Sequence, residues 1–303
     1  MIKRKPFRQM LAERQIKTSS LLCVGLDPLM EKMPVVIREV DIRTIIEQQM
    51  LFNWMTCVVD AVAPYTCMFK TNHAHWEAIV NGVHAMTEVI AYIHRKYPDI
   101  PVVMDCKRGD IGRTQERYGV AHFDHEGADG MNFTPYMGED TVSSLAKWGQ
   151  AGRALVGVCY TSNLTAREMQ DIPIGEQGIQ SWDWYMQAMY RWFQKSDVLE
   201  NAGLVMAAAH KKADSNDIQS DHLKLARLRF GGDLWYLIPG VGTQGGFIEQ
   251  TVEAAFSGIG SIAINCSSSI LFASSGDDFA EAAALEAKKM RELMKAAIPK
   301  DRI

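Results

Sequence analysis

One segment of the chain joins a buried strand to a dense set of charges: Val102-Val-Met-Asp-Cys-Lys-Arg-Gly-Asp-Ile-Gly-Arg-Thr114. The run from Pro101 to Met104 is short and apolar, as expected for a buried strand. Alternate residues of a strand face the same side, so Asp105 and Lys107 should project together from its end. Charges in a dry core are costly unless they pair, which favours a position at the mouth of a ligand site. For an isolated Asp-x-Lys pair, an exposed salt bridge that closes the strand is the alternative.

The rest of the chain alternates apolar runs with segments of helical periodicity. The expected strands cover residues 21–27, 67–70, 101–104, 130–138, 154–159, 203–208, 234–240 and 259–265. The expected helices cover residues 41–62, 76–97, 114–127, 141–148, 182–193, 214–229 and 277–296, and a short helix begins near Phe7. This order predicts an α/β protein, a single (β/α)₈ TIM barrel domain over residues 1–303 with short N-terminal and C-terminal helices.

A doubly wound sheet would also alternate strands and helices. The barrel is favoured because polar residues follow many of the expected strands, and a barrel gathers all its strand ends around one mouth. These polar residues are Asp27, Lys70, Asp105, Lys107, Ser162, Gln244 and the serines after Asn265.

The composition is that of an ordinary globular protein, with 47% hydrophobic residues, 22% charged residues and a net charge of −4. It shows no clustered excess of Lys and Arg, which argues against a nucleic-acid partner. The six cysteines form no Cys-x-x-Cys pair, so reduced thiols are expected. No apolar stretch approaches the roughly 18 residues of a membrane span, and no apolar run follows the basic N-terminus. We therefore expect a soluble, cytoplasmic protein with no membrane partner.

A glycine-rich stretch follows the seventh expected strand: Pro239-Gly-Val-Gly-Thr-Gln-Gly-Gly246. Its Gly-x-Gly-x-x-Gly spacing matches a dinucleotide fingerprint, but residues 257–275 lack the acidic residue that this motif requires. In barrels, the loops after strands seven and eight commonly bind phosphate, and glycines let backbone N–H groups approach an anion. The stretch therefore favours a phosphate site, with a simple tight turn as the alternative.

Six motifs of the chain together resemble those of the orotidine 5′-phosphate decarboxylase family, in its longer bacterial (type 2) form. They are Val24-Gly-Leu-Asp-Pro28, Phe69-Lys70, Asp105-Cys-Lys-Arg-Gly-Asp-Ile-Gly-Arg-Thr114, Thr134-Pro-Tyr-Met-Gly138, Thr161-Ser-Asn163 and Pro239-Gly-Val-Gly-Thr-Gln-Gly-Gly246. The resemblance implies a homodimer of (β/α)₈ barrels that converts orotidine 5′-monophosphate to UMP without a cofactor. It covers about residues 7 to 275.

The resemblance also implies a catalytic array of alternating charges on Lys70, Asp105, Lys107 and Asp110. Lys107 would protonate C6 of the pyrimidine, and Asp105 would lie against the substrate carboxylate. Asp110, with Ile111 and Thr114, would reach into the active site of the partner subunit.

The implied substrate-binding residues are Asp27, Asn72, Ile111, Thr114, Ser162, Pro239, Gln244, Gly245, Ser267 and Ser268. Asp27 would bind ribose hydroxyls, and Ser162 would bind the pyrimidine edge. Gln244 would bridge base and phosphate, and Asn72 lies beside Lys70 at the mouth of the site.

The chain departs from the family pattern after the eighth strand. The family has Asn-x-Ser-Arg-x-Ile, with the arginine on the phosphate, whereas this chain has Asn265-Cys-Ser-Ser-Ser-Ile270. Ser268 stands at the arginine position, and no Arg or Lys lies between Arg229 and Lys288. Losing such a charged contact could weaken phosphate binding by roughly 1.5–3 kcal/mol. One alternative function is therefore a catalytically impaired paralogue that binds nucleotides in a regulatory or structural role. Another is a related magnesium-dependent sugar-phosphate decarboxylase, against which Phe69-Lys70 and Ser162 argue.

Two histidine groups remain, His73-Ala-His75 and His122-Phe-Asp-His125-Glu126. Both spacings could chelate a metal, but neither group shows a cysteine or an evident third ligand. Packed or solvated histidines are the favoured interpretation, and no metal site is expected.

Overall fold

The computed structural model describes residues 4–38, 47–211, 217–241 and 247–300. Its main strands are β1 (Leu22–Gly25), β2 (Met68–Asn72), β3 (Val102–Arg108), β4 (Gly130–Phe133), β5 (Ala154–Tyr160), β8 (Gly203–Met206), β11 (Trp235–Ile238) and β12 (Ile262–Cys266). These strands pair in parallel and close into a barrel in the order β1-β12-β11-β8-β5-β4-β3-β2. The predicted (β/α)₈ barrel is confirmed, and the doubly wound alternative is wrong.

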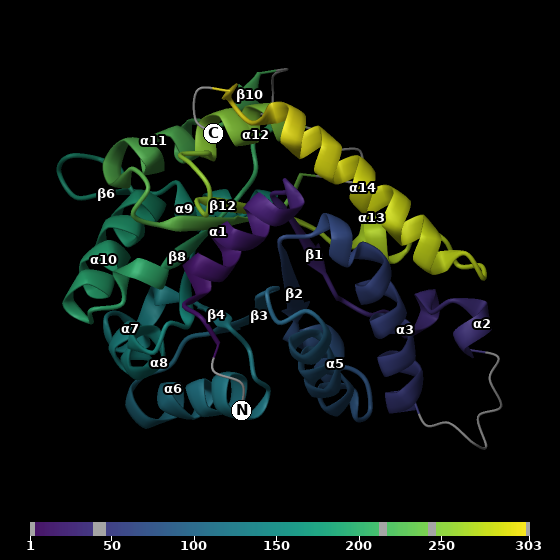
Figure 1. Ribbon diagram of the computed structural model, residues 1–303. Coiled ribbons are helices and arrows are strands. Elements are labelled where there is room, and N and C mark those ends of the chain that lie inside the picture. The colour runs from purple at the N-terminus through teal and green to yellow at the C-terminus, as the bar shows by residue number, and fades with distance from the viewer. Residues whose placement is uncertain (1–3, 39–46, 212–216, 242–246, 301–303) are drawn as a thin grey trace.

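Helices surround the strands (Figure 1). They are α1 (Phe7–Thr18), α2 (Val35–Arg38), α3 (Glu47–Val62), α4 (His73–Glu77), α5 (Gly82–Lys96), α6 (Gly112–Gly119), α7 (Asp140–Ser143), α8 (Ala146–Gln150), α9 (Arg167–Gln170), α10 (Ser181–Lys195), α11 (Asp221–Phe230), α12 (Ile248–Ala255), α13 (Ser268–Leu271) and α14 (Phe279–Ala297). Short helical turns are η1 (Met30–Lys32), η2 (Ala63–Tyr65), η4 (Pro135–Met137), η5 (Leu164–Ala166), η6 (Leu199–Asn201) and the π-helical η3 (Val120–His125). Within the described ranges, no helix is both long enough and apolar enough to span a bilayer.

Some predicted helices have different bounds in the structure. The helix expected over residues 76–97 is divided into α4 and α5, because Asn81 adopts a left-handed conformation with φ 57°. A Cβ atom on Gly82 would lie 2.1 Å from the carbonyl oxygen of Trp76, so this close turn requires glycine. The helix expected over residues 141–148 is likewise two short helices, α7 and α8. The helix expected from residue 214 begins at Asp221 instead.

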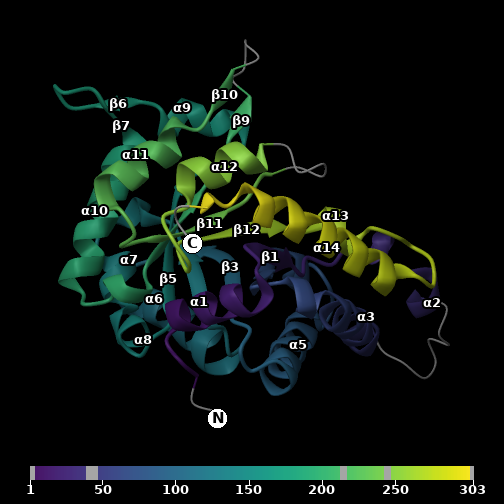
Figure 2. The same ribbon diagram turned by 45° about the horizontal axis from the view of Figure 1, so that its top comes forward.

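Two small antiparallel hairpins were not predicted, because two-residue strands are too short to show a period. They are β6 (Pro173–Ile174) with β7 (Ile179–Gln180), and β9 (His210–Lys211) with β10 (Ile218–Gln219). Figure 2 shows both hairpins at the same end of the molecule, beside α9. The Arg167 guanidinium of α9 contacts Nε2 of His210 in β9 at 3.0 Å.

A small apolar core fills the barrel interior, separate from the larger core between strands and helices. Cavity-lining residues lie two positions beyond residues of this core on the same strand: Asp105 follows Val103, and Leu237, which belongs to both, follows Trp235. Because alternate residues share a face, the same side of a strand contributes first to this core and then to the cavity. Helix α1 covers the other end with Phe7 and Leu11, and it crosses the strands in Figure 1.

A substitution at Phe7 tests how much helix α1 stabilises the barrel. Phe7 is fully buried, and its ring centre lies 4.8 Å from that of Trp235. We expect Phe7→Ala to lower the free energy of unfolding by about 3–5 kcal/mol, since the cavity it leaves cannot be refilled. Ile16→Ala, on the same helix but 66% exposed, should change it by less than about 0.5 kcal/mol. Urea denaturation of both variants measures the difference, and equal values would contradict the covering role of Phe7.

Candidate functional site

A cavity of about 320 Å³ opens at the carboxyl ends of the barrel strands. Active sites of this fold lie at this face. Its lining residues come from all eight strands of the barrel or from the loops that follow them: Asp27, Lys70, Asn72, Asp105, Lys107, Asn132, Val158, Thr161, Ser162, Asn163, Val205, Leu237, Pro239 and Asn265. The cavity therefore has apolar side chains from the barrel core as its floor and polar side chains as its rim.

A chain of alternating charges crosses the cavity. The Lys70 ammonium lies 3.3 Å from Asp27 Oδ1 and 3.2 Å from Asp105 Oδ2. The other oxygen of Asp105 lies 2.6 Å from Nζ of Lys107. Three members of the predicted array are thus brought together by β2 and β3, and Asp27 extends the array on the side of β1.

The charges of the array determine one another's protonation. Burial would lower the pKa of Lys70, but the charges of Asp27 and Asp105 outweigh it and raise that pKa above its usual range. Burial would raise the pKa of Asp105, but Lys70 and Lys107 outweigh it and hold that pKa well below its usual value. At neutral pH, Lys70 is therefore a fixed cation and Asp105 a fixed anion.

Asn132 holds the end of β3 in an unusual conformation. Lys107 has φ 47°, which is left-handed and rare for a residue with a side chain. The backbone N–H groups of Cys106 and Lys107 both donate to Asn132 Oδ1, at 2.8 and 2.7 Å. The amide of Asn132 donates in turn to Asp105 Oδ1 at 2.7 Å. One buried side chain thus positions Asp105 and the backbone from which Lys107 projects.

Asn132 was not among the predicted site residues. Its signal was present: an amide side chain inside the apolar strand β4, where it must find partners. Thr161, Asn163 and Asn265 also line the cavity without having been predicted to.

Of the remaining predicted residues, some line the cavity and others do not. Asn72 lines the cavity, and its N–H donates to Asp27 Oδ1 at 2.9 Å. Ser162 and Pro239 line it on the opposite side. Ser267 Oγ accepts a hydrogen bond from the Asn265 amide at 3.2 Å. The others do not line this cavity or cannot be placed: Ser267 and Ser268 lie outside its lining, and Gln244 and Gly245 lie outside the described residues.

Within a single chain, Asp110 is separate from the array. Its Oδ1 accepts a hydrogen bond from the Ile111 N–H at 2.8 Å, and its own N–H donates to Gln115 Oε1 at 3.1 Å. Ile111 is 49% exposed, and Thr114 is exposed on α6. Neither Asp110, Ile111 nor Thr114 lines the cavity.

Fold and cavity together define a (β/α)₈-barrel protein with an ion-paired lysine–carboxylate site at its mouth. The profile of the family described as "Orotidine 5'-phosphate decarboxylase / HUMPS family" matches residues 20–285, and the chain belongs to this family. The predicted carboxy-lyase family is thereby confirmed.

Individual relatives agree with this assignment. An orotidine 5′-phosphate decarboxylase from Cellvibrio japonicus is 32% identical over 289 residues, covering 94% of this chain and 97% of the relative. The protein of that name from Dechloromonas aromatica is 34% identical over 278 residues, covering 91% and 93%. The structure of Leishmania donovani OMP decarboxylase is 26% identical, with a TM-score of 0.73 over 97% of this chain and 99% of that one.

The clamp of Asn132 on β3 can be tested by amide hydrogen exchange. In Asn132→Ala, two backbone donors lose their acceptor, so we expect the amides of Cys106 and Lys107 to exchange at least about ten times faster. Asn132→Asp retains the acceptor oxygen and should keep them protected. Asn163→Ala, which removes an amide on the cavity rim that bonds only within its loop, is the matched control. Equal exchange in the two alanine variants would contradict the clamp.

Proposed function

We propose that this protein decarboxylates orotidine 5′-monophosphate to UMP in de novo pyrimidine biosynthesis, in the cytoplasm and without a metal or other cofactor. The observation that carries the proposal is the cluster of Lys70, Asp105 and Lys107 inside the cavity. The names of the relatives support the substrate and the reaction. The cavity volume is in the range of small-molecule sites.

Lys107 is the proposed proton donor. Breaking the bond between C6 and the carboxylate leaves its electron pair on C6, where no adjacent π system delocalises it. A fixed ammonium beside C6 stabilises this charge and then transfers its proton to form UMP. The neutral amine regains a proton from solvent, which its 52% exposed side chain allows.

The neighbours of Lys107 have supporting roles in this proposal. Asp105, which lies 2.6 Å from Nζ, orients the ammonium and repels the substrate carboxylate, and this repulsion ends when CO₂ leaves. Lys70 keeps Asp105 ionised, and Asn132 positions both Asp105 and the backbone of Lys107.

The same proposal includes a homodimer. Asp110 carries a carboxylate that the array of its own chain does not use, and the side chains of Ile111 and Thr114 beside it are exposed. A partner chain against this surface would cover the apolar Ile111 side chain and receive Asp110 as the fourth charge of its array.

The nucleotide would extend from Lys107 across the cavity. Asp27 and Asn72 lie on the side of Lys70, where they would bind ribose hydroxyls, and Ser162 and Pro239 lie at the opposite rim. We assign the phosphate to Ser267, Ser268, Gln244 and Gly245, by resemblance to the family. Ser267 lies close to β1: a Cβ atom on Gly25 would be 1.8 Å from its Oγ, so the serine can approach only a glycine here.

A second candidate, from a different class, is a protein that binds nucleotides without converting them. The observation that favours it is Ser268, an exposed neutral side chain at the position where the family carries its phosphate-binding arginine. A folded protein that binds UMP but releases no CO₂ at saturating substrate would establish this second function and exclude the first.

Lys107→Ala tests the mechanism. We expect turnover to fall at least about 100-fold, because both charge stabilisation and proton transfer are lost. Lys147→Ala removes a lysine of similar exposure, paired with Glu116 outside the cavity, and should leave turnover unchanged. A spectrophotometric decarboxylation assay, run with and without EDTA, measures both variants. Undiminished turnover of Lys107→Ala would exclude the proposed donor, and loss of wild-type turnover in EDTA would exclude the metal-free reaction.

Ser268→Arg tests the phosphate end of the site. Restoring a charged contact worth roughly 1.5–3 kcal/mol should lower the Michaelis constant for the phosphorylated substrate about tenfold or more. Ser269→Arg adds the same charge one residue further on and serves as the control. An unchanged or higher Michaelis constant in Ser268→Arg would mean that another group already binds the phosphate.

A further inference from the structure

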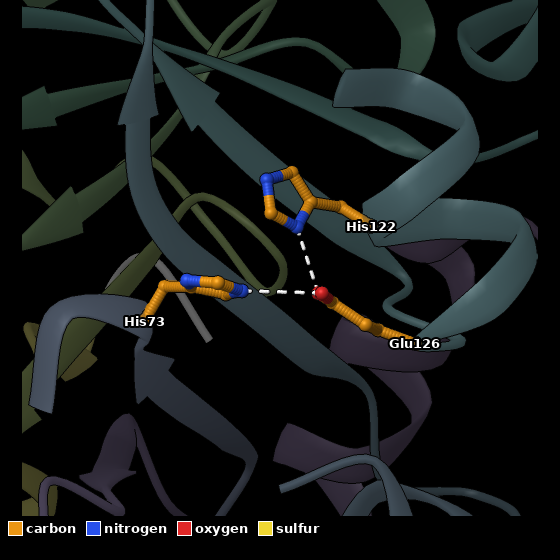
Figure 3. A group of neighbouring side chains, drawn as sticks. All are labelled: His73, His122 and Glu126. Atoms are coloured by element: carbon orange, nitrogen blue, oxygen red, sulfur yellow. Dashed lines mark hydrogen bonds and ion pairs between the residues drawn. The ribbon is translucent and has the colours of Figure 1, made fainter. Parts of the chain in front are cut away.

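His73, His122 and Glu126 meet in a buried cluster outside the barrel cavity (Figure 3). They are 5%, 1% and 9% exposed, and none of them lines the cavity. The cluster takes one histidine from each group noted in the sequence. The other members point elsewhere: His75 Nδ1 lies 3.2 Å from the carbonyl oxygen of Pro28, and His125 is exposed.

The donor atoms of the cluster lie close enough together to approach one metal ion, because all three are within 4.8 Å of one another. His73 Nε2 lies 3.1 Å from Glu126 Oε1, and His122 Nδ1 lies 2.7 Å from Glu126 Oε2. Ligands bound to zinc at 2.0–2.1 Å in a tetrahedron are roughly 3.3 Å apart, so the most widely separated pair of ligand atoms would have to approach by up to about 1.5 Å. Two histidines and one glutamate are a recurrent ligand set for zinc, with water as the fourth ligand.

The surroundings of the cluster orient its ligands. His73 Nδ1 lies 3.0 Å from Glu77 Oε1, so a carboxylate accepts the proton of the nitrogen that faces away from the cluster. Metal-binding histidines are commonly oriented in this way by a second carboxylate. His122 belongs to the π-helical turn η3, and Glu126 follows that turn directly. Such turns are rare and are frequent at functional sites.

The proton balance of the cluster shows what a metal would replace. His73 faces a carboxylate at each ring nitrogen; burial would lower its pKa, but Glu126 and Glu77 raise it. Its ring therefore carries both protons below that raised pKa. His122 accepts a hydrogen bond from Arg108 Nε at Nε2, 3.1 Å away, and so carries its proton on Nδ1.

A bound metal would displace the Nε2 proton of His73 to solvent and move the Nδ1 proton of His122 to Nε2. The Arg108 guanidinium would then turn from His122 toward Glu77, whose Oε1 already lies 3.3 Å from it.

We propose that His73, His122 and Glu126 bind one divalent transition-metal ion, best matched by Zn²⁺, at a site separate from the decarboxylation cavity. The ion would join α4, which follows β2, to the segment that follows α6. The site is independent of the proposed reaction, which uses other residues.

Isothermal titration of the metal-free protein with Zn²⁺ tests the site. We expect one strong site per chain in the wild type, with about one proton released per ion below the pKa of His73, measured by comparing buffers of different ionisation enthalpy. Binding should strengthen as pH rises, because Zn²⁺ competes with that proton. His122→Ala and Glu126→Gln should each lose the strong site, whereas His125→Ala, on the same turn, should retain it.

Glu126→Gln keeps the size of the side chain and one of its two acceptor oxygens, so it removes the charged ligand with little change in packing. Far-ultraviolet circular dichroism checks that each variant is folded. No Zn²⁺ binding to the wild type, or equal binding by the wild type and Glu126→Gln, would overturn the site. The decarboxylation assay in EDTA tests the reaction and the Zn²⁺ titration tests the metal site. Either proposal can therefore fail while the other stands.

Discussion

The buried ammonium of Lys70 imposes the strictest requirement on this fold. It is only 4% exposed, and a cation at that depth is stable only with paired anions. Those anions come from the two neighbouring strand ends, Asp27 after β1 and Asp105 in β3. The parallel register pairs Lys70 with Gly25 and Asn72 with Asp105, so Asp27 and Asp105 lie about two residues beyond Lys70, and its long side chain extends between them. The cavity, its charges and the proposed chemistry all depend on this register.

The end of β3 serves two polar sites at once. Lys107 faces the cavity, where Asn132 and Asp105 fix its position. Arg108, the next residue, faces outward and contacts His122. The register of β3 against β4 shifts between Met104 and Arg108, and Asn132 satisfies the backbone groups that this irregularity leaves unpaired. The two sites are therefore chemically separate but share one short piece of backbone.

The sequence was sufficient to predict the barrel, because eight apolar runs alternate with amphipathic segments and polar residues follow many of them. The Asp-x-Lys alternation was sufficient to place Asp105 and Lys107 together at the end of one strand, whereas the grouping of Lys70 with them was implied by the resemblance to the family. The sequence could not reveal the role of Asn132, which depends on how β4 pairs with β3. The cluster of His73, His122 and Glu126 was missed because its members come from two distant segments. The array position of Asp110 stays a prediction, since it requires a second chain.

Helix α1 has a consequence for how the chain is made. Its Phe7 packs on Trp235, so the first helix of the chain needs a strand from near the other end before its apolar face is covered. Domains are synthesised from the N-terminus at about 5–20 residues per second, and contacts of large sequence separation form late. The nascent chain thus exposes the apolar face of α1 until β11 has left the ribosome. During that interval, a chaperone can bind the exposed apolar face of α1, and aggregation competes most strongly with closure of the barrel.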